Sequence, residues 1–183
     1  SANSAHLKHD FNRIRIHNSF RDGGDVLIAK GASTMNDDAK KTALRMIPYG
    51  IYVLTAADSD GNVAAATVNW VTQTAFAPPL VVIGVKADSG AYTTLKNAGT
   101  FALNMLAKGQ QGMAFAFFKP AEAGDGEISG EPYRTAETGA PILINALACI
   151  ECKVEEIVER GDHHIVVGSV VIAALDDLFD FAF

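Results

Sequence analysis

The stretch ATVNWVTQTAFAPPLVVIGVK, residues 66–86, decides the fold. Residues 63–76 are rich in β-branched and aromatic side chains and predict one strand, which Pro78 and Pro79 then break. Residues 80–86 form a short apolar run and predict the next strand. Strands that follow one another this closely indicate antiparallel pairing, because a parallel pair needs a long crossover connection.

The flanking sequence is interpreted from similar signals. An Asp-Gly turn within residues 58–62 joins a predicted strand over 51–57 to the strand over 63–76. Ser89 caps a predicted helix that ends at Gly99. The other predicted elements are a helix that begins at Asn36 or Asp37 and runs through Met46, a strand over 100–107, a short helix over 110–118, and strands over 146–159 and 163–174 joined by a turn at Gly161-Asp162.

Several strands in hairpin order with only short helices predict a mainly β fold with a split, largely antiparallel barrel. Residues 119–140 combine proline, glycine and acidic residues, which predicts a long surface loop. Residues 1–34 are polar and without periodicity, so we interpret them as an upstream extension or an arm that packs across a neighbouring subunit. The folded domain is expected over residues 35–183.

Composition excludes several classes of function. With 183 residues and 49% hydrophobic content, the chain is expected to form one globular domain. Residues 35–183 carry ten basic and eighteen acidic side chains, which argues against nucleic acid or anionic lipid as a partner. The apolar runs are shorter than the roughly 20 residues that span a bilayer. Only two cysteines are present and no leader pattern is visible, so a cytoplasmic location is expected.

Cys149 and Cys152 have the spacing of a redox or metal-binding pair. They lie in a predicted strand, where positions three apart point to opposite faces of the sheet. We therefore expect neither a disulfide nor a shared metal, with Cys152 in the core and Cys149 incidental. The chain also has no nucleophile elbow, Walker loop or Rossmann fingerprint, so hydrolysis is not indicated.

The first polar cluster is Lys86, Asp88 and Ser89, where a strand meets a helix. Free N–H groups at a helix N-terminus, a hydroxyl and a lysine charge suit a phosphate monoester. The same residues also suit simple helix capping, and the pattern alone leaves both interpretations open.

Two further groups of residues could contact a ligand. The strand segment Thr67, Val68, Asn69 and Trp70, with Gln73 beyond it, suits either a planar heterocycle or an ordinary strand with Trp70 in the core. At the last hairpin the sequence is Gly-Asp-His-His, so alternation directs one of His163 and His164 inward and the other outward.

Taken in order, these segments resemble the flavin reductase family of FMN- or FAD-binding split barrels, which includes flavoredoxin-like proteins and the reductase domains of cyanobacterial diflavin proteins. The resemblance runs from about residue 43 to residue 174. Its pieces are MIPYGIYVLTA, ATVNWVTQTAFAPPLVVIGVK, FALNML, FFKP, GAPIL followed by ALACIECKV, and GDHHIVVGSVV.

The resemblance implies roles for particular residues. The strand that contains Thr67, Val68, Asn69, Trp70 and Gln73 would lie against the isoalloxazine and ribityl groups, with backbone N–H groups that polarise the flavin. Lys86 and Ser89 would hold the flavin phosphate, and His163 would orient the nicotinamide. Ala65 stands where many relatives have Gly, and Ala91 where many have Thr, so one phosphate ligand is missing. The end, LDDLFDFAF, also differs from the usual closing segment.

The implied function is hydride transfer from NADH or NADPH to flavin N5, with FMN as the cofactor and FAD as an alternative. Two other hypotheses stay open: a flavoredoxin-like FMN carrier without nicotinamide activity, and a non-catalytic split-barrel binding protein. The resemblance further implies a homodimer, with an oxygenase or an electron-transfer protein as the acceptor. No ribose-phosphate pocket is visible in the sequence, so it does not distinguish NADH from NADPH.

Overall fold

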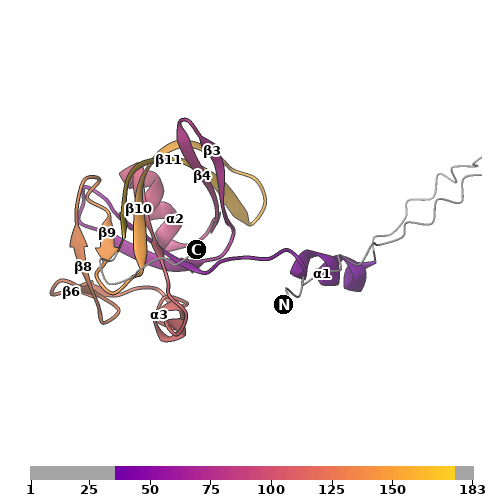
Figure 1. Ribbon diagram of the computed structural model, residues 1–183, viewed down its shortest axis with the longest axis horizontal. Coiled ribbons are helices and arrows are strands. Elements are labelled where there is room, and N and C mark those ends of the chain that lie inside the picture. The colour runs from indigo at the N-terminus through magenta and orange to yellow at the C-terminus, as the bar shows by residue number, and fades with distance from the viewer. Residues whose placement is uncertain (1–35, 176–183) are drawn as a thin grey trace, which may run out of the picture. The chain divides into compact units, whose positions relative to one another are not determined.

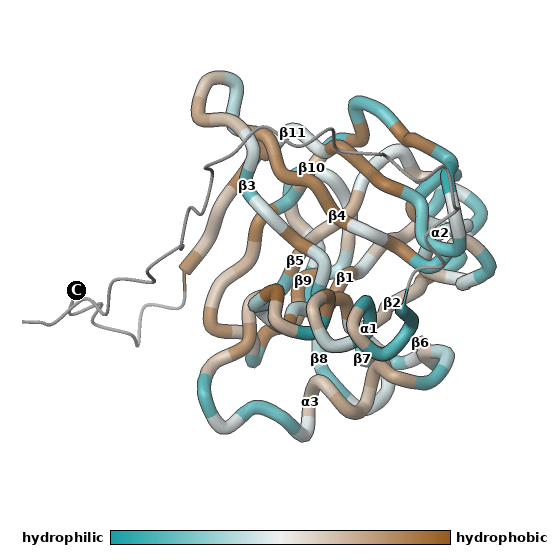
Figure 2. The backbone as a smooth tube through the Cα atoms, turned by 90° about the vertical axis from the view of Figure 1, so that its right-hand side faces the viewer, coloured by the Kyte–Doolittle hydropathy of each residue, from teal (hydrophilic) through white to brown (hydrophobic). Residues whose placement is uncertain are grey.

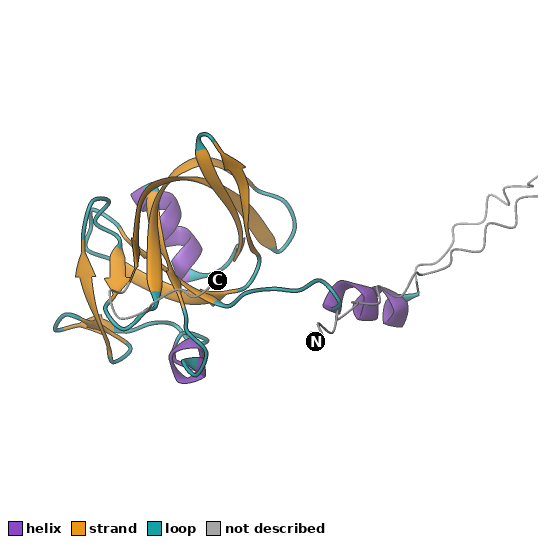
Figure 3. Ribbon diagram, viewed as in Figure 1, coloured by secondary structure: helices purple, strands orange, loops and turns teal. Residues whose placement is uncertain are grey.

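The computed structural model describes residues 36–175, which are mainly β-structure with three short helices (Figure 3). The predicted fold class is therefore confirmed. In chain order the elements are α1 (Asp37–Arg45), β1 (Tyr52–Ala57), β2 (Val63–Val68), β3 (Val71–Phe76), β4 (Pro79–Lys86), α2 (Gly90–Ala98), β5 (Thr100–Met105), α3 (Gln111–Ala116), β6 (Ala123–Gly124), β7 (Glu127–Ile128), β8 (Glu131–Thr135), β9 (Pro141–Leu143), β10 (Ala148–Val158) and β11 (His163–Leu175).

The described residues belong to two units, one that ends at Thr42 and one that begins at Ala43. Helix α1 begins where the sequence predicts it, because Oδ1 of Asn36 accepts a hydrogen bond from the N–H of Ala39 at 2.9 Å. The interpretation of residues 1–34 falls outside the described residues.

One antiparallel sheet of seven strands forms the body of the second unit, in the order β2-β1-β5-β10-β11-β4-β3. Strands β10, β11, β4 and β3 of this sheet are labelled in Figure 1. Strands β2 and β3 are neighbours in sequence but lie at opposite ends of this order. The prediction of one strand over residues 63–76 is therefore wrong. The chain leaves β2 at Asn69 and Trp70, and the next residues pair with β4 instead of β1. The sheet curves, and β2 and β4 line the same cavity, as expected of a split barrel.

Helix α2 supplies the apolar contacts that close the main core. Leu95 is fully buried and belongs to one cluster with Leu54 of β1, Ile83 of β4 and Leu103 of β5. Strands β4 and β11 are largely hydrophobic, whereas α2 is more hydrophilic (Figure 2). Ser89 caps α2 and Gly99 ends it with φ 66°, both as predicted.

Gly168 of β11 makes room for the largest fully buried side chain of this core. A Cβ at position 168 would lie 2.6 Å from Cζ of Phe101, whose side chain is fully buried. Any larger residue at position 168 would therefore displace Phe101.

Residues 119–140 differ from the predicted surface loop. They contain β6, β7 and β8, which form a small sheet in the order β6-β7-β8-β9. Ile128 is fully buried against Phe117 and Leu143, so this segment has an apolar anchor of its own. The strands in this segment are only two to five residues long, and the many turn residues around them led to the prediction of a loop.

A buried amide connects β1, β5 and β9. The side chain of Asn104 is fully buried, and its Nδ2 donates to the Val53 carbonyl and to Oγ1 of Thr55, each at 3.1 Å. Its Oδ1 accepts from the Leu143 N–H at 2.9 Å. The Thr55 hydroxyl in turn donates to the Pro141 carbonyl. These bonds fix β9 to the main sheet, together with the apolar contacts of Ile142 and Leu143.

Glu151 of β10 is a fully buried acid. Its Oε2 accepts hydrogen bonds from the N–H of Thr138 at 2.7 Å and from Oγ1 of Thr138 at 2.6 Å. The carboxylate therefore holds the segment that leads into β9 against the sheet.

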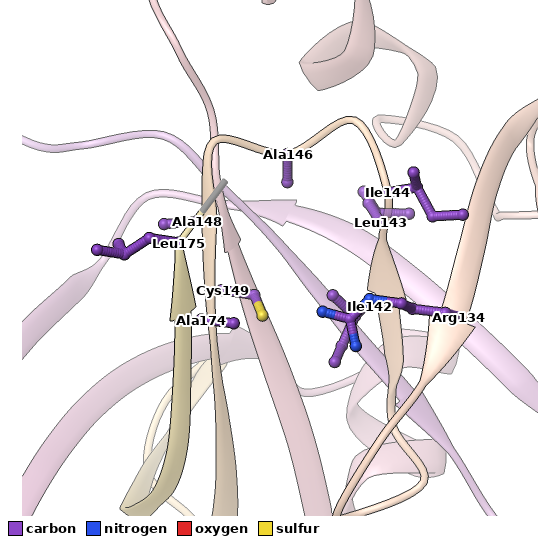
Figure 4. A pocket seen from close by; sticks show the side chains of 9 residues that line it. All are labelled: Arg134, Ile142, Leu143, Ile144, Ala146, Ala148, Cys149, Ala174 and Leu175. Carbon is purple, nitrogen blue, oxygen red and sulfur yellow. The ribbon is translucent and has the colours of Figure 1, made fainter. Parts of the chain in front are cut away.

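Cys149 and Cys152 pack in different clusters, as their alternation along β10 predicts. Cys152 is in the main core, and burial raises the pKa of its thiol to about 12. Cys149 was expected to be incidental, but its side chain is also buried. Its Sγ lies in a cavity of about 220 Å³, on the side of Ile142 and Arg134 (Figure 4). Burial raises the pKa of this thiol, although the charge of Arg134 lowers it.

Within residues 36–175, no helix combines the length and the apolar character that crossing a membrane requires.

We expect Asn104→Ala to lower the free energy of unfolding by about 2–3 kcal/mol, since it leaves buried donors and acceptors without partners. Urea denaturation followed by circular dichroism measures this change. Asn97→Ala, at an exposed position of α2, is the control and should alter stability by less than about 0.5 kcal/mol. Equal effects of the two substitutions would show that the buried amide is not a structural tie.

Both thiols should react slowly with a thiol-specific disulfide reagent at pH 8, because they are buried and their pKa values are raised. Full reaction of two thiols per chain is expected only after denaturant is added. Rapid reaction of the native protein would mean that Cys149 or Cys152 is accessible.

Candidate functional site

A cavity of about 570 Å³ lies between β2, the end of β4, the start of α2 and the segment after α3. Its volume falls within the range of roughly 300–1,000 Å³ that small-molecule sites occupy. Six of the predicted site residues line it, and they come from four separate parts of the chain: Thr67, Val68, Asn69, Lys86, Ser89 and His163.

The β2 wall is an edge of the sheet with small side chains. Residues 64–66 are all alanine, and β2 pairs with β1 on one side only. The Thr67 N–H points away from β1 and donates to the Phe117 carbonyl at 3.2 Å. Because strand residues alternate, the backbone groups of Ala65 and Asn69 point to the same free edge. A flat ligand can therefore approach the backbone closely at this wall.

Both hydrogen-bond donors of Thr67 bind acceptors within the protein. Besides its N–H, its hydroxyl donates to the Ala114 carbonyl at 2.6 Å. Thr67 therefore fixes α3 and the following residues against β2, and any backbone donor to a ligand must come from its neighbours.

At the other end of the cavity lies the N-terminus of α2. The Ser89 hydroxyl accepts from the Tyr92 N–H at 3.1 Å and donates to the Lys86 carbonyl at 2.7 Å. The N–H groups of Gly90 and Ala91, also in the first turn, lie next to the cap. Such donors and the helix dipole favour a negative group.

Lys86 already has a carboxylate beside it. Its Nζ lies 2.9 Å from Oδ1 of Asp88, and both side chains are exposed. The hydrogen bond from Lys86 lowers the pKa of the Asp88 carboxyl, which is therefore ionised at neutral pH. A bound phosphate must compete with Asp88 for the lysine.

His163 stands opposite Lys86 in the β11–β4 register and lines the cavity. Its Nδ1 lies 3.2 Å from the Asp162 carboxylate, and this contact lowers the pKa of the Asp162 carboxyl. The Trp70 ring meets the His163 ring edge to face, with 4.5 Å between centroids.

Trp70 does not line the cavity itself. Its ring lies over Gly84, where a Cβ would come within 3.0 Å of Cε3. The absence of a side chain at Gly84 lets the indole pack against β4, and from there it holds the imidazole of His163. The structure thus places Trp70 behind the histidine.

Gln73 lies apart from the other predicted residues. It lines a different cavity of about 360 Å³ together with Tyr52, Leu103 and Val170. Its Nε2 donates to the Ala75 carbonyl at 3.2 Å. The separation follows from the break between β2 and β3, because Gln73 belongs to the strand at the opposite edge of the sheet.

A buried tyrosine connects the two ends of the site. The Tyr92 hydroxyl of α2 donates to Oε1 of Glu159 at 2.7 Å, and Nζ of Lys96 lies 2.6 Å from the same oxygen. Burial and the bond to Glu159 raise the pKa of Tyr92, and the bond from Lys96 lowers the pKa of Glu159. Helix α2 is thereby fixed to the hairpin that carries His163.

Sequence reasoning missed the lining residues that follow α3, among them Phe118 and Lys119. They belong to the FFKP segment, which has no regular periodicity and follows a short helix. The only signal was the presence of this segment among the pieces of the family resemblance.

Comparisons with known proteins agree with this geometry. The family described as "Flavin reductase like domain" matches residues 44–180. A flavin reductase of Pseudomonas putida is 33% identical over 130 residues, which cover 71% of this chain and 75% of that protein. The reductase subunit of stachydrine N-demethylase from Rhizobium meliloti is 30% identical, over 76% of this chain and 59% of that protein.

A solved structure supports the same assignment. The NADH:FAD oxidoreductase SgcE6 of Streptomyces globisporus superposes with a TM-score of 0.65 and 29% sequence identity, over 80% of this chain and 89% of that one. The family match covers most of the chain, and the Pseudomonas putida relative exceeds 30% identity over more than two thirds of it. This chain therefore belongs to the flavin reductase-like domain family.

Proposed function

We propose that this protein is an NAD(P)H:flavin oxidoreductase that binds flavin in the 570 Å³ cavity. The observation that carries the proposal is that one cavity brings together a free strand edge, an anion-binding helix N-terminus and His163, in a chain of this family. When bound there, the flavin supplies the chemistry by accepting a hydride from C4 of the nicotinamide at N5.

The residues present fit a flavin phosphate at the start of α2. The Gly90 and Ala91 N–H groups and the Lys86 charge supply donors, and a Cβ at Gly90 would meet no atom within 4 Å. Ala91 contributes no hydroxyl, which favours a flavin that exchanges over one that is held permanently. FMN is the form we propose, and FAD fits the same phosphate site.

His163 orients the nicotinamide in this proposal. The Trp70 ring and the Asp162 carboxylate restrict the imidazole, so it reaches the cavity in a defined position. Close approach of the two rings is the main requirement for hydride transfer, and the small β2 wall leaves room for it.

Three further parts of the proposal concern organisation. Residues 1–34 are an extension and residues 35–183 the flavin reductase-like domain. The protein forms a homodimer. Reduced flavin passes to an oxygenase or an electron-transfer protein, since the Rhizobium relative is the reductase subunit of an N-demethylase.

The full chain with FMN or FAD should oxidise NADH or NADPH, measured as loss of absorbance at 340 nm under air. His163→Ala should lower kcat/KM for the nicotinamide by about 10- to 100-fold, with the flavin dissociation constant within about twofold. His164→Phe keeps an aromatic ring against Tyr92 and is the control, with activity close to the wild type. A rate no higher than that of free flavin would refute the proposed activity. Flavin retained through gel filtration without that activity would indicate a carrier.

Charge changes at the phosphate site should act in opposite directions. We expect Lys86→Met to weaken FMN binding by about tenfold or more, because a charge-assisted hydrogen bond is lost. Asp88→Asn should strengthen it severalfold, because Lys86 loses its competing partner. Fluorescence titration measures both, and riboflavin, which has no phosphate, should be unaffected. Equal effects on riboflavin and FMN would place the phosphate elsewhere.

A further inference from the structure

The outer wall of the flavin cavity is the segment that follows α3. Phe117, Phe118, Lys119, Pro120 and Ala121 all line the cavity. None of the proposed roles for the strand edge, the α2 N-terminus or His163 uses these side chains. The side chains of this wall are therefore free to contact another part of the ligand.

The wall is held in place by the flavin-facing strand. The Phe117 carbonyl accepts from the Thr67 N–H, and the Ala114 carbonyl accepts from the Thr67 hydroxyl. The Phe117 side chain is buried in a cluster with Met113. The two residues after Phe117 are thus fixed at the rim of the cavity by contacts that do not involve their own side chains.

Phe118 offers an exposed aromatic surface at this rim. Its side chain is 64% exposed although it lines the cavity. The Phe115 ring packs edge to face against it, with 5.4 Å between centroids, and limits its movement. A supported, exposed ring of this kind is a platform on which a purine base can stack.

Lys119 differs from Lys86, the other lysine that lines the cavity, because no carboxylate within residues 36–175 neutralises its charge. Lys86 is paired with Asp88, and His163 lies beside Asp162. Among the described residues, no carboxylate lies within ion-pair distance of Lys119. Its positive charge is therefore available to an anionic ligand, and it comes from a different wall than Lys86.

We propose that Phe118 and Lys119 form a second subsite that binds an adenosine diphosphate group, with the adenine on Phe118 and a phosphate on Lys119. This inference rests on the proposed function and extends it. Two ligands of that function carry the group, namely FAD and the nicotinamide dinucleotide. FMN lacks it, which provides the comparison.

The experiment compares the full chain with Phe118→Ala and Lys119→Ala. FMN and FAD are titrated by flavin fluorescence, and KM for NADH or NADPH is measured with FMN as the flavin. Lys108→Ala is the matched control, because Lys108 is exposed, precedes α3 and does not line the cavity. Circular dichroism melting checks that each variant folds, as expected for exposed side chains.

If the group belongs to FAD, each variant weakens FAD binding by about tenfold and leaves FMN binding within about twofold. If it belongs to the nicotinamide dinucleotide, each variant raises KM by about tenfold, leaves kcat nearly constant, and changes FMN and FAD binding by less than twofold. Either result supports the subsite. Lys108→Ala should change none of these values.

The subsite is refuted if both variants behave like Lys108→Ala, or if they weaken FMN and FAD equally while KM stays constant. Those results leave the proposed function intact, because flavin still binds and the nicotinamide is still oxidised. A wild-type protein that binds neither flavin and oxidises no nicotinamide refutes the proposed function and this subsite together.

Discussion

The packing of Trp70 against Gly84 is the contact on which the arrangement of the site depends. The Gly84 N–H donates to the Trp70 carbonyl at 2.8 Å, and the indole ring occupies the space above the missing side chain. This contact attaches the chain to β4 immediately after it leaves β2. It therefore determines that β2 and β3 become opposite edges of one sheet, with the cavity beside β2. It also positions the ring that restrains His163.

Much of the fold was predictable because its signals are local. The caps of α2 at Ser89 and Gly99 and the turn before His163 follow from a few adjacent residues. The break at Asn69 and Trp70 was not predictable in this way, since β-branched side chains occur on both sides of it. What separates β2 from β3 is the choice of partner strand, which depends on residues distant in sequence.

The site was predictable to a similar degree. Lys86, Ser89 and His163 were singled out from the residue pattern and given roles by the family resemblance, and the structure brings them to one cavity. Gln73 was grouped with them because a continuous strand was assumed, and it lies at another cavity. Phe118 and Lys119 were missed because tertiary contacts bring their segment to the site, namely the hydrogen bonds of Thr67 and the burial of Phe117.

The burial of both cysteines bears on the chemistry that surrounds them. Reduced flavin that meets oxygen yields hydrogen peroxide, and a thiolate is the form of cysteine that peroxide oxidises. Cys149 and Cys152 do not line the 570 Å³ cavity, and their raised pKa values keep them as thiols. The two cysteines of an enzyme that leaks reducing equivalents to oxygen would thus react slowly with its own by-product.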